Sequence, residues 1–137
     1  MNLVIPSVGS NINPLTNIKK AAERLAEINC LISVSRFIKT SPEGNPDQPD
    51  FLNGAFYIRA RLGRSSLKDK LKDIEAKLGR IRTSDINAPR TIDLDIVVFN
   101  GEVINPDYER YTFVKKSVDE IFEQIRSKEW KRMIKVV

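Results

Sequence analysis

The order of strand-like and helical segments constrains the fold of this chain more than any other feature. Runs rich in apolar and β-branched residues predict four strands, at 2–8, 31–38, 51–62 and 91–99. Apolar residues that recur at spacings of three and four predict two amphipathic helices, at 14–28 and 65–78. A further helical pattern follows at 117–128. The order β-α-β-β-α-β with an added C-terminal helix predicts an α+β ferredoxin-like sandwich.

The connecting segments complete this expected fold. A loop is predicted at 40–50, which holds three prolines and a glycine, and a short edge strand is predicted at 108–114. The tail at 130–137 has an ambiguous pattern. Because the helices of such a sandwich cover one sheet face, we expect the opposite face to be free to carry a site. The 137 residues fit one domain spanning 1–137.

Composition excludes several classes of site. The chain has one cysteine, Cys30, and no histidine. An internal disulfide, a cysteine or histidine zinc centre, and a Ser-His or Cys-His dyad are therefore impossible within it. Any bound metal must use oxygen ligands, which favours hard ions such as Mg²⁺.

The net charge of +5 suits an anionic partner such as a nucleotide, a nucleic acid or an acidic surface, but for the charge alone ordinary surface charge is the first explanation. No apolar run approaches the roughly 18 residues that a membrane-spanning helix needs. The first residues also lack the pattern of a signal peptide. We expect a soluble, cytoplasmic protein with no membrane partner.

The predicted strand at 91–99 carries two acidic residues, Asp93 and Asp95. Since side chains alternate along a strand, both carboxylates should lie on one face, with Cβ atoms roughly 7 Å apart. The opposite face should point into the core through the residues Ile92, Leu94, Ile96 and Val98. Two like charges this close need solvent or a cation, so the alternatives are a solvated strand face and a divalent metal site.

Three arginines, Arg80, Arg82 and Arg90, flank this acidic pair in the sequence. Guanidinium groups bind phosphate oxygens through paired hydrogen bonds. Aspartate is also depleted in strands, which makes two of them in a strongly apolar strand unusual. Carboxylates that hold metal beside arginines that hold phosphate indicate a nucleotide-polyphosphate site.

At these residues the chain resembles the 6-hydroxymethyl-7,8-dihydropterin pyrophosphokinase family. The segment 89–96, Pro-Arg-Thr-Ile-Asp-Leu-Asp-Ile, is similar to the signature of that family. Further similar motifs occur in the same order along the chain, at 8–11, 47–53, 74–75 and 78–82. The resemblance extends over about residues 3 to 125.

The resemblance implies transfer of diphosphate from ATP to 6-hydroxymethyl-7,8-dihydropterin, with release of AMP, in folate biosynthesis. It implies two Mg²⁺ ions held by Asp93 and Asp95, and ATP phosphates bound by Arg82 and Arg90. It also implies that Arg80 supports the phosphate site. Glu75 and Ile96 are expected to line the nucleotide pocket.

For the pterin, the resemblance implies that Phe51 stacks on one ring face and that the Asn53 amide binds the ring edge. Phe113 is the candidate for the opposite face, and Thr40 and Glu43 lie where the pterin-contacting loop of the family runs. Taken singly, Phe51, Asn53 and Phe113 would more often have a structural role.

Two segments depart from the family pattern. Asn87 and Ala88 stand where the family usually carries tryptophan and glycine. The segment 103–114 is shortened and lacks the usual Pro-His loop, so Arg110 and Phe113 are the candidates for closing on ATP and pterin.

Alternative functions stay open at this point. One is a divergent family member that binds nucleotide or pterin without efficient transfer, and another is a small basic nucleic-acid-binding domain. Aromatic residues are not interleaved with basic ones as stacking platforms would be, so we expect no nucleic acid partner. A monomer or weak homo-oligomer is expected.

Overall fold

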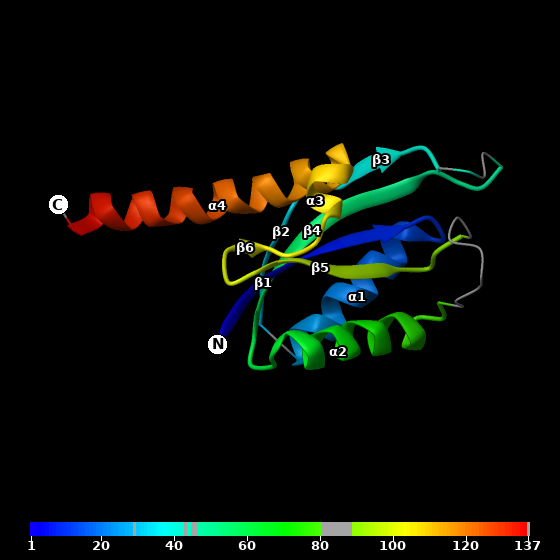
Figure 1. Cartoon of the computed structure of the whole chain (residues 1–137), viewed down its shortest axis with the longest axis horizontal. Coiled ribbons are helices and arrows are strands. Elements are labelled where there is room, and N and C mark those ends of the chain that lie inside the picture. Colours follow the sequence, from blue (N-terminus) through cyan, green and yellow to red (C-terminus); the bar gives the residue numbers. More distant parts are fainter. Residues whose placement is uncertain (29, 43, 45–46, 81–88, 137) are drawn as a thin grey trace.

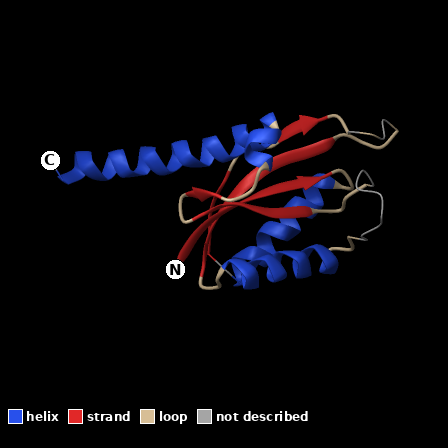
Figure 2. Ribbon diagram, in the orientation of Figure 1, coloured by secondary structure: helices blue, strands red, loops and turns tan. Residues whose placement is uncertain are grey.

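One antiparallel sheet lies at the centre of the protein, with helices against both of its faces (Figures 1 and 2). The computed structural model describes residues 1–28, 30–42, 44, 47–80 and 89–136, with side chains for all of these except 30 and 128–136. The elements in chain order are β1 (Asn2–Ser10), α1 (Pro14–Ile28), β2 (Cys30–Val34), β3 (Ile38–Thr40), β4 (Phe51–Ala60), α2 (Arg64–Lys77), β5 (Asp93–Phe99), β6 (Glu102–Val103), α3 (Asp107–Arg110) and α4 (Thr112–Val136).

The strand order confirms the predicted ferredoxin-like sandwich. The strands lie in the order β2-β4-β1-β5-β6, with β3 also paired to β4. Each pairing is antiparallel. The two strands that each follow a helix, β2 and β5, therefore flank the central pair of β1 and β4, as the β-α-β-β-α-β arrangement requires.

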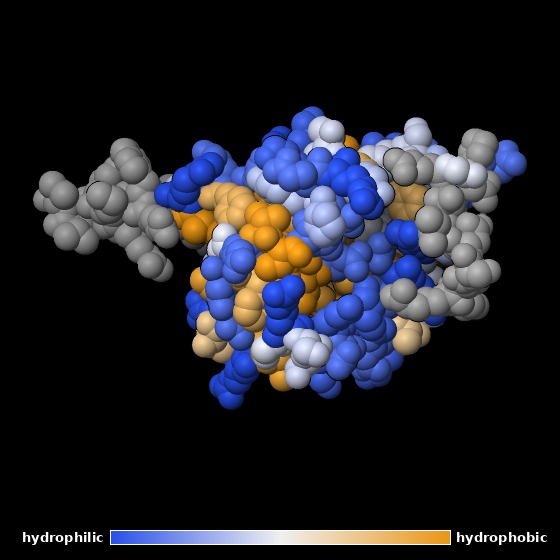
Figure 3. Space-filling model, viewed as in Figure 1, coloured by the Kyte–Doolittle hydropathy of each residue, from blue (hydrophilic) through white to orange (hydrophobic). Residues whose placement is uncertain are grey.

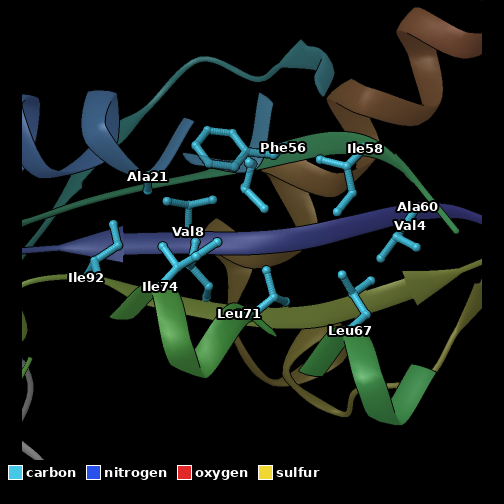
Figure 4. Packing of buried hydrophobic residues seen from close by; sticks show 12 residues of the cluster. Val4, Val8, Ala21, Phe56, Ile58, Ala60, Leu67, Leu71, Ile74 and Ile92 are labelled. Atoms are coloured by element: carbon cyan, nitrogen blue, oxygen red, sulfur yellow. The ribbon is translucent and has the colours of Figure 1, made fainter. Parts of the chain in front are cut away.

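Helices α1 and α2 cover one face of the sheet, as their amphipathic patterns predict. Ala21 and Leu25 of α1 are fully buried, and so is Leu67 of α2. They pack with residues of β1, β4 and β5 into one cluster, in which the apolar stripe of α2 points at the strands (Figure 4). Burial of such side chains contributes about 1.5–3 kcal/mol each, so this face supplies much of the stability.

The C-terminal helix α4 lies on the opposite face, so the prediction that this face is free was wrong in part. Val114, Val118 and Ile121 of α4 are buried there against Ile5 and Ala55 of the sheet. The helix covers only one end of that face and continues beyond the sheet (Figure 1). The other end of the face is left for a site.

A bulge in β5 changes which of its residues face each side. Pairing with β1 runs Ile5↔Val98 and then Pro6↔Ile96, so one residue of β5, Val97, is extra. Val98 consequently packs on the α4 side, whereas Ile96 packs on the α1–α2 side. The prediction that Val98 shares a face with Ile96 was therefore wrong, because strict alternation does not survive a bulge.

The predicted strand at 31–38 is two strands, β2 and β3. The break lies at Ser35, whose hydroxyl accepts the Ala55 N–H at 2.8 Å while its own N–H donates to the Ala55 carbonyl at 2.9 Å. Past this point the ring of Phe37 covers Gly54 so closely that a Cβ on that glycine would lie 2.7 Å from it. The Ser35 hydroxyl takes the place of a backbone acceptor in the pairing with β4. The chain can therefore shift relative to β4 before β3 begins.

The predicted edge strand at 108–114 was wrong, because this segment forms α3 and the start of α4. The Asn105 side chain accepts the Asp107 N–H at 2.9 Å, a local bond that favours a helical start. The tail continues α4 to Val136. Within the described part of the chain, each helix is too short or too polar to cross a lipid bilayer.

Candidate active site

The open end of the α4-side face holds a cavity of about 470 Å³. A row across the three central strands forms part of its floor, since Asn53 pairs with Gly9 and Gly9 pairs with Asp93. With neighbouring strands about 4.8 Å apart, Asn53 and Asp93 stand roughly 10 Å from each other. The row therefore places an amide at one end of the cavity and a carboxylate at the other.

Figure 3 shows how apolar and polar side chains are distributed over the described surface in this view. Apolar surface gathers over the β5–β6 end of the molecule, where Val103 is exposed, and the opposite end is mainly hydrophilic.

Two arginines hold Asp93 at the charged end of the row. Arg80 reaches Oδ1 of Asp93 at 2.7 Å, and Arg90 reaches Oδ2 at 3.0 Å. Burial alone would raise the pKa of Asp93, but the positive charges of Arg80, Arg90 and Lys72 outweigh it, and the pKa is lowered. Asp93 is therefore ionised at neutral pH and able to bind cations.

Asp95 lies one step along β5 on the same face and has a different environment. Among the described residues, Asp95 forms one ion pair, which joins its Oδ1 to the Nζ of Lys72 at 3.0 Å. Burial and the nearby charge of Asp93 raise the pKa of the Asp95 carboxyl, and Lys72 offsets them only in part. This carboxylate is the less well neutralised of the two.

Asp93, Asp95, Lys72, Arg80 and Arg90 are called the charged group below. Glu75 of α2 connects this charged group to the sheet. Its side chain is buried, and Oε2 accepts the backbone N–H of Leu94 at 2.8 Å and an N–H of Lys72 at 2.9 Å. Oε1 accepts an N–H of Arg80 at 2.6 Å. The structure therefore places Glu75 beneath the cavity, where it bonds to Lys72 and Arg80, and outside the described linings of both cavities.

Aromatic side chains form the opposite end of the cavity. Phe51, Tyr111 and Phe113 line it, and the rings of Tyr111 and Phe113 stack at 5.4 Å between centroids and 24° between planes. The Asn53 amide donates to the Thr40 hydroxyl at 2.6 Å, which orients its carbonyl oxygen over Gly9. This end can hold a flat ring and read its polar edge.

A second cavity, of about 540 Å³, opens between α2 and β5. Apolar residues of its wall include Leu71, Leu94 and Ile96. Among the described residues, Lys72 and Asp95 line both cavities. The two cavities therefore meet at the charged group.

With this geometry established, the comparisons with known proteins decide the family. Residues 5–123 match the sequence model of the family described as 7,8-dihydro-6-hydroxymethylpterin-pyrophosphokinase (HPPK). The chain belongs to this family. The resemblance seen in the sequence motifs is thereby confirmed.

Individual HPPK relatives agree. The chain is 35% identical over 101 residues to the 2-amino-4-hydroxy-6-hydroxymethyldihydropteridine pyrophosphokinase of Haemophilus influenzae, covering 72% of this chain and 62% of that protein. The protein of the same name from Pseudomonas aeruginosa is 37% identical, over 74% of this chain and 64% of its own length. That of Bacillus subtilis is 33% identical, over 90% of this chain and 80% of its own. The chain thus spans less than two thirds of the first two relatives.

The two aspartates fit the oxygen-ligand metal site that an HPPK fold implies. Both line the first cavity from the same strand face. The described residues contain no group of three or more histidine, cysteine or acidic side chains able to hold an ion. Water and phosphate oxygens would have to complete the coordination, which is how Mg²⁺ is commonly bound.

The structure brings together most of the HPPK site residues expected from the sequence. Those that line the first cavity are Thr40, Phe51, Asn53, Arg80, Arg90, Asp93, Asp95 and Phe113. Arg110 ends α3 as an exposed residue outside the described linings of both cavities. Arg82, Glu43, Asn87 and Ala88 lie outside the described residues.

Sequence reasoning missed Lys72 and Tyr111. Lys72 lies three residues before Glu75 on a helix, a spacing that places both on one face, so its ion pair with Glu75 was open to prediction. Tyr111 was assigned to an edge strand, and only the turn into α4 brings its ring against Phe113.

Proposed function

We propose that this protein transfers diphosphate from ATP to 6-hydroxymethyl-7,8-dihydropterin and releases AMP, as a step of folate biosynthesis. The row Asn53–Gly9–Asp93 carries the proposal. It places a ring-reading amide and a phosphate-directed charged group roughly 10 Å apart on one floor, matching a two-ring substrate with a hydroxymethyl arm. Family membership and the names of the relatives support the same reaction.

At the aromatic end, we assign the pterin to the space between Phe51 and the Tyr111–Phe113 pair. A flat heterocycle gains stacking energy there, and the Asn53 carbonyl offers an acceptor to the ring N–H groups. Thr40 keeps that carbonyl oriented. Gly9 leaves room for the ring beside it, because it has no side chain.

At the charged end, we assign the triphosphate to Arg80 and Arg90, with Arg82 as a further ligand carried over from the family motif. We assign the nucleoside to the second cavity, where Ile96 and Leu71 offer apolar contact. The phosphate chain then passes the point where the cavities meet. Arg110 retains its proposed role as a closing residue only if α3 moves.

The reaction needs few protein groups beyond these. The hydroxymethyl oxygen forms a bond to the β-phosphorus, the bond from that phosphorus to the α–β bridging oxygen breaks, AMP leaves, and the hydroxyl proton is released. Mg²⁺ held by Asp93 and Asp95, two ions in our proposal, would supply charge neutralisation at the phosphates. The arginines stabilise charge on the oxygens, and the cavity aligns the two substrates.

The test is direct. The full chain incubated with ATP, Mg²⁺ and the pterin should release AMP and form the pterin diphosphate, as followed by chromatography. Asp95→Asn should lose Mg²⁺-dependent ATP binding, measured by calorimetry, while Asp73→Asn on the exposed face of α2 should retain it. Pterin-independent AMP release, or no AMP at all, would contradict the proposal.

One observation favours a second candidate. Arg110 lies outside both cavities, so the cation expected to close on ATP is absent from the described arrangement. A protein that binds nucleotide and pterin without efficient transfer would fit this. It predicts normal binding of both ligands with no AMP.

We further propose that the protein acts in the cytoplasm, where both substrates occur, as a monomer or weak homo-oligomer. Size-exclusion chromatography with light scattering tests the oligomeric state.

A further inference from the structure

Lys72 has no part in the proposed function so far, yet it lies at the centre of the charged group. Its Nζ donates to Oδ1 of Asp95 at 3.0 Å, to Oε2 of Glu75 at 2.9 Å and to the Leu94 carbonyl at 2.9 Å. The three donors of an ammonium group are thereby all used. Lys72 thus sits in a cage of three oxygens, two of them from carboxylates, as a bound cation would.

Among the described side chains that form ion pairs here, the charges balance. Asp93, Asp95 and Glu75 face the cationic groups Lys72, Arg80 and Arg90 through ion pairs of 2.6 to 3.0 Å. A divalent ion arriving alone at the aspartates would add positive charge beside three cations. Such repulsion is strong in a partly buried site. Metal binding therefore requires either that Lys72 leaves Asp95 or that an anion arrives.

Lys72 can move to such an anion without leaving the site. Its side chain is 29% exposed and lines both cavities, at the point where they meet. Its four-carbon stem is flexible, and an ammonium binds phosphate as a point charge. A polyphosphate running from the second cavity into the first passes within its reach.

We propose that Lys72 occupies the cation position at Asp95 until the nucleotide binds. Lys72 then moves onto the polyphosphate, and the metal ion takes its place at Asp95. Lys72 is thus a positioning residue that makes metal binding depend on nucleotide. The inference rests on the proposed function, since it assumes a metal–polyphosphate complex at Asp93 and Asp95.

Mn²⁺ titrations followed by electron paramagnetic resonance test it without relying on activity. The wild type should bind Mn²⁺ weakly alone and tightly with a non-hydrolysable ATP analogue. Lys72→Gln should bind Mn²⁺ alone about three- to tenfold more tightly, because it removes a partly buried competing charge. The same variant should bind the metal–nucleotide complex about three- to tenfold more weakly.

These opposite changes distinguish the proposal from a structural role, which would shift both affinities in one direction or neither. Lys72→Arg should restore the wild-type pattern, and Lys77→Gln, an exposed lysine of the same helix paired with Asp73, should change neither affinity. Thermal melting checks that each variant is folded.

Wild-type protein that binds no Mn²⁺ even with the analogue would overturn the proposed function and this inference together. Tight Mn²⁺ binding with the analogue that ignores Lys72→Gln would overturn this inference alone.

Discussion

The two ends of the first cavity are built differently, although one row of the sheet joins them. At the charged end, Asp93 is held by two arginines, and Glu75 joins α2 to the backbone of β5. At the aromatic end, Phe51 comes from a strand, Tyr111 from the junction between α3 and α4, and Phe113 from the first turn of α4. Ion pairs and hydrogen bonds therefore fix the charged end within the ferredoxin-like core. The position of the aromatic rings at the other end depends on how α4 packs on the sheet.

This difference predicts which properties of the protein can be changed independently by substitution. Substitutions at the charged end should alter phosphate chemistry and stability together, because the same ion pairs serve both. Substitutions at the aromatic end should alter pterin binding with little effect on nucleotide binding. Four predictions test or refine this contrast, from the largest effect to the smallest.

The largest effect is expected for Asp93→Ala at the charged end. Loss of this carboxylate removes the partner that Arg80 and Arg90 share and, in our proposal, an oxygen ligand of the metal. We expect kcat to fall by at least about 100-fold, the scale seen when a charge-stabilising group is removed. Steady-state AMP release measures it, with Asp73→Ala as the matched surface control.

At the aromatic end, Phe51→Leu should raise the KM for the pterin by about tenfold, since stacking of one ring contributes about 1–3 kcal/mol. The dissociation constant of the ATP analogue, measured by calorimetry, should not change. An equal loss of nucleotide affinity would show that the two ends are coupled and would break the contrast.

A smaller effect is expected where the two ends meet, at Gly9. A Cβ there would lie 2.7 Å from Oδ1 of Asn53, so Gly9→Ala must displace the amide that we propose binds the pterin edge. We expect the KM for the pterin to rise about three- to tenfold with a small change in melting temperature. Asn53→Ala should produce a similar KM, and the double variant should be little worse than either single one.

The smallest expected effect is on the pH dependence of stability, measured without nucleotide or metal. The two aspartates should contribute to it in opposite directions. The pKa of Asp93 is lowered from 3.8, so it stabilises the fold above that pH and loses this contribution as pH falls through its folded pKa. The pKa of Asp95 is raised from 3.8, so its contribution is present below 3.8 and is lost as pH rises through its folded pKa.

At pH 7, Asp93→Asn should therefore lower the melting temperature and Asp95→Asn should raise it. Both differences should shrink when melting is repeated near pH 3. Two aspartates that shift the melting temperature in the same direction at pH 7 would contradict the electrostatic assignment.

Helical and strand periodicity predicted much of the fold. The two helices and the strands that became β1, β4 and β5 are long and strongly patterned, so local sequence suffices to place them within a few residues. The short segments were harder. Residues 108–114 carry aromatic residues that suit a strand, but the Asn105 bond to Asp107 and the docking of α4 favour helix.

The candidate site shows the same division. Asp93 and Asp95 follow from their spacing on one strand, and the family motifs indicate Arg80, Arg90, Phe51 and Asn53. The role of Glu75 beneath the cavity could not be predicted, because it depends on the distance between α2 and β5. The same holds for Lys72, whose neighbours Leu94 and Asp95 are more than twenty residues away.

By itself, the sequence determined the order of elements, the acidic pair on one strand, the absence of histidine chemistry and the family. These depend on residue identity and on spacings within one element. Only the tertiary structure decided that α4 covers one end of the sheet face that carries the cavity, that a bulge turns Val98 toward this face, and that Lys72 forms an ion pair with Asp95. Such features arise from contacts between distant segments, whose geometry local periodicity does not encode.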